Sequence, residues 1–495
     1  MNIKSKIVIL ALVSISFISC TSNRVIRDKS KLAYSKNNYE KAISYLHEEN
    51  TEQSLIDLNL DEAMLLTLNG QYKESSTLFN QTGYDMALYT GEMSIGQMIQ
   101  AALTSEESVT YVGPAYEYSM IDIMNAFNYM KMGDYDNARA MMRRSFNNNK
   151  SAFNQLKEKL REINRQSENV FYSSYTQDAI SDMANEGYYY DFNSFVNTNL
   201  NKKETDYGLS PFIFFLGASL FANDGDQDLA YEWIDNIRPF ISNDLFRSVV
   251  AIPKGMGSIN VVALSDTIVK REEMIQHIPM IVDLYGLHVN FKLSWPYVPE
   301  SYNVVNNIKV RVFDQYTESN GKIKLGKIVD SGSCELIEDF DDAVRLDVAS
   351  KAEGALARSF IRNITRKTAS YIAGILAVEA AKELSDEGGM LEFLAYLGTI
   401  SALQLTMDAL DNTEHADIRQ CAFFPSKATA SGFIVEPGIY TVEVNYLDKS
   451  GDIVKREYIT DVLVEEGKTA VVPSEYINTG NIRLTDTKQE ENYYY

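Results

Sequence analysis

The spacing of apolar side chains divides the chain into two parts. Between residues 31 and 245 they recur every three or four positions, which predicts amphipathic helices. After Pro239 apolar and polar residues alternate in several short runs, which indicates strands. The predicted strands are Ser258–Leu264, Leu287–Leu293, Val304–Phe313, Cys334–Ile337, Lys427–Ile434, Gly438–Tyr446, Lys455–Val464 and Ala470–Val472. The pattern therefore predicts an α+β multidomain chain whose first half is helical.

Two helical stretches interrupt the predicted strands. Residues 343–384 are rich in small side chains, and residues 390–410 are apolar enough to be buried. Nearer the C-terminus, residues 448–452 have the composition of a hairpin turn, and residues 435–440 resemble a turn found in small β-sandwich modules of secreted proteins. We therefore expect a mixed α/β region followed by a small β-sandwich-like module.

One short motif recurs between apolar helical patterns in the first half. Lys36–Ala42, Asn69–Ser75 and Met132–Ala138 align, and Asp224–Ala230 is a weaker copy. Tyr39 and Tyr72 are 33 residues apart, close to the roughly 34 of a tetratricopeptide repeat, and the motif resembles that family. Other spacings are irregular, so the resemblance implies an irregular tetratricopeptide-like α-solenoid over residues 31–245.

Each repeated position has a physical role. The glycines stand where a helix ends in a turn that needs a positive φ, with Asn37 in the first copy. The tyrosines are expected to pack over that turn, and the small residues lie where two helices cross closely. The turn and packing residues so assigned are Tyr39, Ala42, Gly70, Tyr72, Gly133, Tyr135, Ala138, Gly225 and Ala230.

The resemblance also indicates which helix face would line the inner surface of the solenoid. In the third repeat this face carries Met120, Ile123, Phe127, Met130 and Lys131. Such an apolar face suits a bound peptide or partner helix, so these residues form a candidate partner-binding groove. The alternative, which we favour, is that the chain itself covers them.

The N-terminus reads as a bacterial lipoprotein signal. Lys4 and Lys6 precede an apolar run, and Ser19-Cys20 closes it, which resembles the lipobox cleaved by the lipoprotein signal peptidase. Cys20 would then be the lipidated first residue, and multiple acyl chains hold a protein stably at a membrane. Thr21 follows the cysteine, which favours the outer membrane facing the periplasm. No later segment is long and apolar enough to cross a membrane.

Together these features predict an order of segments along the chain. It comprises a signal peptide over 1–19, a polar tether over 20–30, the tetratricopeptide-like helical domain over 31–245, a β-rich region over 250–340, a helical segment over 341–412, the β-sandwich-like module over 413–475 and a flexible tail over 476–495.

The chain is strongly acidic, with a net charge of −22. Nucleic-acid binding is driven by basic side chains that neutralise phosphates, so this balance argues against a nucleic-acid partner. Besides Cys20 the chain has Cys334 and Cys421. In an oxidising compartment they could form a disulfide, and the alternative is two buried free thiols.

The motifs of common catalytic and cofactor sites are missing from the sequence. None of the four histidines has the spacing of a zinc site, and we find no phosphate-binding loop and no nucleophile elbow. Arg358, Arg362 and Arg366 form one helical stripe, which fits either binding of an acidic partner or lipid phosphate or, as we favour, a solvated face paired with this chain's own acids. We therefore expect no cofactor, no metal and no enzymatic activity.

Three stretches carry a wider likeness: residues 257–272, residues 336–340 with the arginine stripe downstream, and residues 416–438. With the repeats, they resemble a family of uncharacterised bacterial envelope lipoproteins. Members tend to have Trp where Cys421 stands. The resemblance implies an architecture and a location, and some relatives are encoded near lipoproteins that activate peptidoglycan synthases.

We therefore expect a lipid-anchored periplasmic scaffold or adaptor that binds protein partners of the cell envelope and acts in envelope assembly. A sharper version is an accessory lipoprotein of a secretion or peptidoglycan-synthase complex. The alternatives are a wall-active hydrolase with its site in residues 250–475, and a surface adhesin. The sequence gives no oligomeric state.

Overall fold

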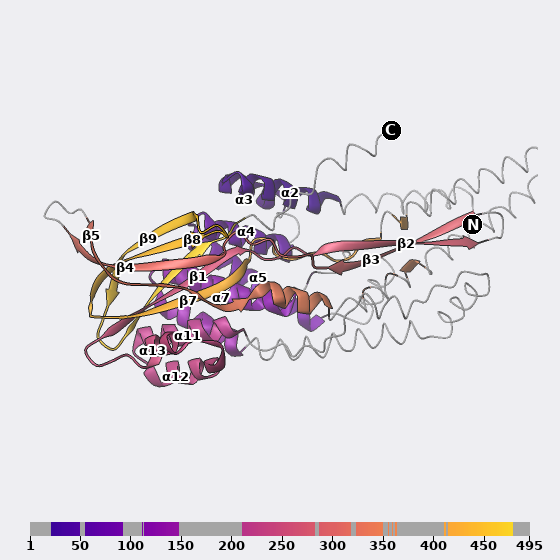
Figure 1. Ribbon diagram of the computed structural model, residues 1–495. Helices are drawn as coiled ribbons and strands as arrows, with labels where there is room; N and C mark the ends of the chain where they lie inside the picture. The colour runs from indigo at the N-terminus through magenta and orange to yellow at the C-terminus, as the bar shows by residue number, and fades with distance from the viewer. Residues whose placement is uncertain are drawn as a thin grey trace, which may run out of the picture.

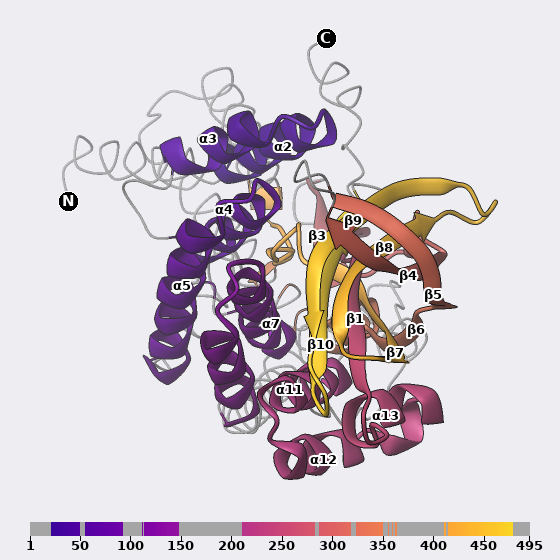
Figure 2. The same cartoon turned by 90° about the vertical axis from the view of Figure 1, so that its left-hand side faces the viewer.

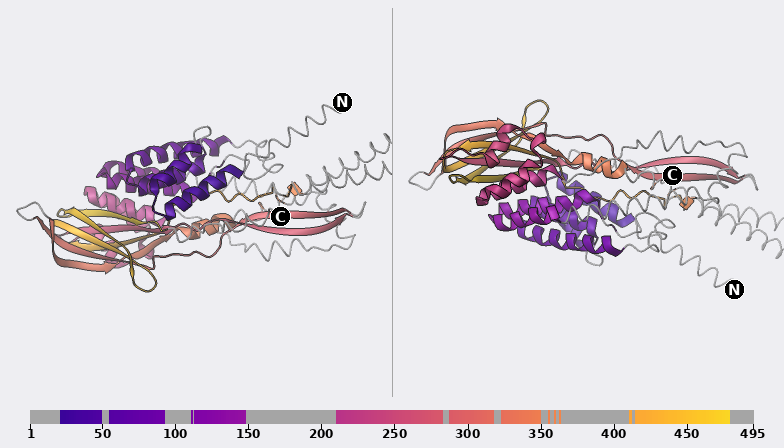
Figure 3. Two further views of the ribbon diagram at one scale, coloured as in Figure 1. Left: turned by 90° about the horizontal axis from the view of Figure 1, so that it is seen from above. Right: turned by 90° about the horizontal axis from the view of Figure 1, so that it is seen from below.

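A computed structural model of the chain describes residues 21–49, 55–92, 111, 113–147, 210–282, 287–317, 323–349, 355, 359, 362–363, 410–411 and 414–478. Helices and sheets lie in separate layers, and a long two-stranded hairpin extends from the body (Figures 1 and 3). This arrangement confirms the predicted mixture of helices and sheets. Cys20 and the predicted signal peptide lie outside the described residues.

The helices of the first half follow one another as neighbours in space. The helices are α2 (Thr21–Ser35), α3 (Tyr39–Glu49), α4 (Ile56–Leu68), α5 (Tyr72–Glu92), α7 (Ala115–Lys131), a helix over 135–147, α11 (Pro211–Asp224), α12 (Gln227–Asp235), η2 (Arg238–Phe240) and α13 (Asn243–Val250). Each helix contacts the next one in the order α2, α3, α4, α5 and α7, and again in the order α11, α12 and α13. In Figure 2, α2 and α3 lie at one end of the helical layer and α11–α13 at the other.

The four repeated turns share one backbone geometry. Asn37, Gly70, Gly133 and Gly225 all have a positive φ, between 56° and 89°. At each turn the next residue donates its N–H to a carbonyl five positions earlier, as in Gln71 to Leu66 and Asp134 to Tyr129, at 2.9 and 2.8 Å. This bond satisfies a carbonyl that the helix end would otherwise leave unpaired. The positive φ expected from the sequence is therefore present at all four turns.

Small residues lie where the helices cross. Ala42, Ala138 and Ala230 are fully buried, as is Ser75 at the matching position of the second copy. Tyr39 and Tyr135 pack against the hydrophobic core next to their turns, while Tyr72 begins α5 and is half-buried. These residues let neighbouring helices approach closely.

Two four-stranded sheets form the rest of the body. One has the order β10-β1-β7-β6 and the other β5-β4-β8-β9, while β2 and β3 pair only with each other among the described strands. The strands are β1 (Gly257–Thr267), β2 (Glu272–Val282), β3 (Leu287–Tyr297), β4 (Asn307–Thr317), β5 (Ile323–Ser333), β6 (Glu335–Asp339), β7 (Pro425–Val435), β8 (Gly438–Leu447), β9 (Ile453–Val464) and β10 (Thr469–Tyr476). β1 runs parallel to β10, and every other pairing is antiparallel.

The sheet that contains β1 is buried on both faces. On one face Ile259 and Val261 join a core shared with β4, β8 and β9. On the other face Val262 and Leu264 join the core that the helices fill. Alternate side chains of a strand point to opposite faces, so β1 is the middle of a three-layer stack and is buried along its whole length.

Both sheets combine strands from residues 250–340 with strands from residues 413–475. β1 pairs with β7 and β10, and β4 pairs with β8. The predicted C-terminal module therefore does not have sheets of its own. Pairing between segments this far apart leaves no local signal in the sequence, which is why a boundary was expected there.

Two strands were missed because their sequences lack clear alternation. β2 begins with two glutamates and contains Pro279, and β5 contains glycine, lysine and serine residues at an exposed edge. The other predicted strands are present, and Gly451 forms the hairpin turn before β9 with a positive φ. The predicted helix over 343–384 is described over 340–349, and most of the helix predicted over 390–410 lies outside the described residues.

Both predicted flexible ends are in part ordered structure. Residues 21–30, expected as a tether, belong to α2, where Ile26 and Ser30 are buried. Tyr476, expected at the start of the tail, ends β10, and the carbonyl of Ile477 accepts a hydrogen bond from the hydroxyl of Tyr34 at 2.5 Å. α2 and the residues up to Ile477 thus belong to the body, and residues 479–495 lie outside the described residues.

Gly133→Ala tests the turn geometry without a steric clash, because a Cβ at this position would meet no atom within 4 Å. We expect a loss of about 1–2 kcal/mol in the free energy of unfolding, because a Cβ disfavours the left-handed backbone. Gly133→Asn is the matched control and should lose less, since asparagine adopts this conformation more readily. Urea unfolding measures both, and an alanine variant as stable as the parent would contradict the assignment.

Candidate functional site: the inner face of the helical layer

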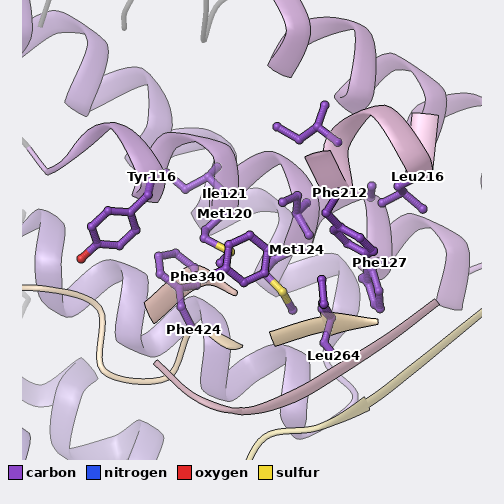
Figure 4. Packing of buried hydrophobic residues seen from close by; sticks show 14 of the residues in the cluster. Tyr116, Met120, Ile121, Met124, Phe127, Phe212, Leu216, Leu264, Phe340 and Phe424 are labelled. Atoms are coloured by element: carbon purple, nitrogen blue, oxygen red, sulfur yellow. The ribbon is translucent and has the colours of Figure 1, made fainter. Parts of the chain in front are cut away.

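The predicted partner-binding groove on α7 is covered by the chain itself. Met120, Ile123, Phe127 and Met130 are at most 4 % exposed and belong to the core between the helices and the sheet. Figure 4 shows Phe212, Phe340, Phe424 and Leu264 around the same face. The ring centroids of Phe127 and Phe212 are 6.3 Å apart. These side chains therefore do not line an open groove, because burying an apolar stripe against the sheet is strongly favourable.

Lys131, the polar member of the predicted groove, also has partners within the chain. Its ammonium group lies 3.3 Å from a carboxylate oxygen of Glu457 and 3.1 Å from one of Glu475. These acids belong to β9 and β10, so Lys131 joins the end of α7 to both sheets.

A segment without helix or strand, residues 414–424, runs between the helical layer and the sheet. The N–H of Cys421 donates to Glu117 on α7 at 2.8 Å, and the N–H of Ala422 donates to Asp61 on α4 at 2.6 Å. Buried main-chain donors must be paired, and here helix carboxylates replace a strand partner. The helical layer therefore holds an extended segment by its backbone, and that segment is its own.

Asp61 is held in turn by the first helix. The guanidinium of Arg27 donates to Asp61 at 2.8 Å and to Asp57 at 2.7 Å. Asp61 is fully buried, so an arginine fork is needed to offset the cost of burying its charge. Arg27 thus connects α2, through α4, to the 414–424 segment.

Glu117 is also fully buried in this network. Its second oxygen accepts a hydrogen bond from the hydroxyl of Tyr111 at 2.7 Å. Burial raises the pKa of Glu117 to about 7, although the donors on Cys421 and Tyr111 and the charge of Arg271 oppose this shift.

Arg271 forms further hydrogen bonds around the 414–424 segment. Its guanidinium donates to Asp347 at 2.7 Å, and its main-chain N–H donates to the Gln420 side chain at 3.3 Å. Gln420 returns a bond to the carbonyl of Val269 at 3.0 Å. A second buried pair, Arg362 with Glu414, holds the start of the segment at 3.0 Å.

At Arg362 the favoured interpretation of the arginine stripe holds in part, because the residue pairs with an acid of this chain as expected but is buried and not solvated. Arg362 is fully buried against Glu414, and Arg358 and Arg366 lie outside the described residues.

The acids of β6 hold two helix starts in a comparable way. Glu335 accepts a hydrogen bond from the hydroxyl of Ser242 at the start of α13, and Glu338 accepts one from the N–H of Phe212 at the start of α11.

Cys334 and Cys421 are free thiols. Cys421 lies in the core between helices and sheet, whereas Cys334 packs against the core between the two sheets. Burial raises the pKa of both, that of Cys334 to about 11. Of the two alternatives left by the sequence, the structure has two free thiols rather than a disulfide, and neither is a reactive thiolate.

Within the described ranges, no group of three or more His, Cys, Asp or Glu residues could hold a metal ion. Among the helices of those ranges, none has the length and hydropathy to cross a bilayer. The buried charged groups of the site bind other parts of the same chain. The chemical role of these groups is therefore to hold the extended backbone of residues 414–424 in place.

Sequence reasoning missed Arg27, Asp61 and Glu117 as members of one network. Asp61 and Glu117 do carry a signal, because each is an acid within a strongly apolar helix. Residues 416–421, which carry part of the family likeness, lie in the segment that these acids hold.

Comparisons with protein-family models, with curated proteins and with solved structures give no match for this chain.

Glu117→Ala should lower the free energy of unfolding by about 2–4 kcal/mol, because it leaves the Cys421 N–H and the Tyr111 hydroxyl without an acceptor. Glu117→Gln is the matched control, since its carbonyl oxygen can still accept from Cys421. Urea unfolding of the two variants gives the comparison, and equal losses would exclude the hydrogen-bond role.

The same pair of variants tests the ionisation of Glu117. Its pKa is higher in the folded chain, about 7, than its ordinary 4.5, so folding favours the protonated form. The protonated form therefore adds to the free energy of unfolding. The added stability, at most about 3 kcal/mol, is complete below about pH 4.5 and is lost as the pH rises through about 7. In urea unfolding at several pH values, Glu117→Gln should lack this part of the pH dependence of the free energy of unfolding.

Proposed function

We propose that this chain is a lipid-anchored adaptor of the bacterial cell envelope. It is held through Cys20 at the outer membrane, faces the periplasm and binds protein partners that act in envelope assembly. Its helical layer is a tetratricopeptide-like α-solenoid, and its two four-stranded sheets form a β-sandwich-like body. No residue is assigned a catalytic role, and no cofactor is required.

One observation carries the adaptor proposal: the inner face of the helical layer holds an extended segment through backbone N–H groups, at Cys421 and Ala422. Recognition of extended backbone is a binding mode, and stacked helical hairpins are typical of interaction proteins. The buried charged side chains of this face bond to other groups of the same chain. They therefore support a binding role and not a catalytic one.

The filled inner face restricts where a partner can bind. Since the α7 face is covered, partner contacts are assigned to outward surfaces such as the exposed side of α5, where Tyr84 and Leu88 are 62 % and 46 % exposed. The lipid anchor is supported by the residues around Cys20, and the net charge of −22 favours a protein partner over nucleic acid.

The test is site-specific photo-crosslinking in intact cells that make the full chain with a C-terminal tag. A photo-reactive residue at Tyr84 on α5, or at Leu463 on β9, is exposed and leaves the cores intact. We expect capture of one or two envelope proteins in defined ratio, and loss of this capture in Cys20→Ala because the variant is no longer held at the membrane.

Two outcomes would contradict the proposal. A parent chain whose Cys20 carries no acyl group, by mass spectrometry, would exclude the lipid anchor. A lipidated chain that is captured alone from both positions would exclude the adaptor role and would favour a function located in residues 250–475.

A further inference from the structure

The first described helix has a charge opposite to that of the chain. Residues 21–36 contain five basic residues, Arg24, Arg27, Lys29, Lys31 and Lys36, and one acid, Asp28, so their net charge is +5 − 1 = +4. The whole chain has a net charge of −22. A cationic segment in so acidic a chain presents the favourable surface for approach to an anion.

Four of these basic residues, Arg27, Lys29, Lys31 and Lys36, divide between two faces. The inward face is fixed to the body: Arg27 binds Asp57 and Asp61, the Ser30 hydroxyl donates to the Ala42 carbonyl at 2.9 Å, and Lys31 is 6 % exposed. These contacts set the rotation of the helix about its axis.

The outward face carries Lys29, Leu32 and Lys36. Both lysines are exposed, and Leu32 is 40 % exposed. Their spacing of three and four residues places them on one stripe, with Lys36 just past the end of the helix. Asp28, four residues before Leu32, is exposed on the same stripe, which therefore has a net charge of +2 − 1 = +1. Cations beside an exposed apolar side chain suit contact with anionic headgroups.

The position of this stripe in the chain points to the same ligand. Lys29 follows Cys20 by nine residues, and the part of this stretch within α2, from Thr21 to Lys29, is about 12 Å long at the rise of a helix. α2 also lies at an end of the helical layer, away from α11–α13 (Figure 2). A lipid attached to Cys20 would therefore bring the stripe within reach of headgroup phosphates.

We propose that the outward face of α2 lies on an anionic phospholipid surface, with Lys29 and Lys36 on headgroup phosphates and Leu32 at the apolar boundary. This inference rests on the proposed lipid anchor at Cys20. The anchor supplies attachment to the membrane, and the stripe supplies orientation, because it turns one defined side of an acidic molecule to the bilayer.

The test uses the full lipidated chain reconstituted in vesicles made with brominated lipids, which quench nearby tryptophan. Leu32→Trp places the probe in the stripe, and the two native tryptophans, Trp233 and Trp295, are both buried. We expect strong quenching of the introduced tryptophan in vesicles that contain phosphatidylglycerol, and weaker quenching in pure phosphatidylcholine. Leu463→Trp, exposed on β9, is the matched control and should not be quenched.

Charge reversal gives the second arm. Lys29→Glu with Lys36→Glu, in the Leu32→Trp background, should abolish the quenching while the chain stays on the vesicles through its lipid. A Leu32→Trp chain that is retained but whose introduced tryptophan is unquenched, or is quenched equally in neutral vesicles, overturns the inference. A chain that is not retained at all shows instead that the anchor at Cys20, and with it the proposed function, has failed.

Discussion

The structure depends on hydrogen bonds between one buried segment, residues 414–424, and acids of the helices α4 and α7. The backbone of residues 421–422 donates to Glu117 and Asp61, and without these acceptors two buried N–H groups would be unpaired. Because Asp61 is itself held by Arg27, the bond network extends from the first described helix to the segment that leads into β7. This network fixes the helices in one orientation on the sheet.

The hydrophobic layers then follow from that orientation. β1 lies between two cores, one shared with the second sheet and one shared with the helices. The apolar face of α7 lies in the second core, and Lys131 pairs with acids of β9 and β10 at its edge. A face that could have bound another protein is therefore used to join the two halves of this chain, and partner binding is left to outward surfaces.

Local features were predictable from the sequence, and long-range ones were not. The turns at Gly70, Gly133 and Gly225 are formed within a few residues, so composition and spacing suffice to find them. The pairing of Ser258 with Thr469 joins residues 211 positions apart, and no local pattern reports it. For the same reason the expected boundary before residue 413 does not separate two sheets, and residues 21–30 read as a tether although Arg27 has its partners on α4.

If residues 414–424 join the helices to the sheet, they open only together with the layers on either side. Hydrogen exchange followed by mass spectrometry at increasing urea concentrations tests this directly. We expect peptides covering residues 414–424, α7 and β1 to reach the same free energy of opening and to merge into one transition. If peptides from residues 414–424 exchange at a much lower free energy while α7 and β1 remain protected, the segment does not join the two layers.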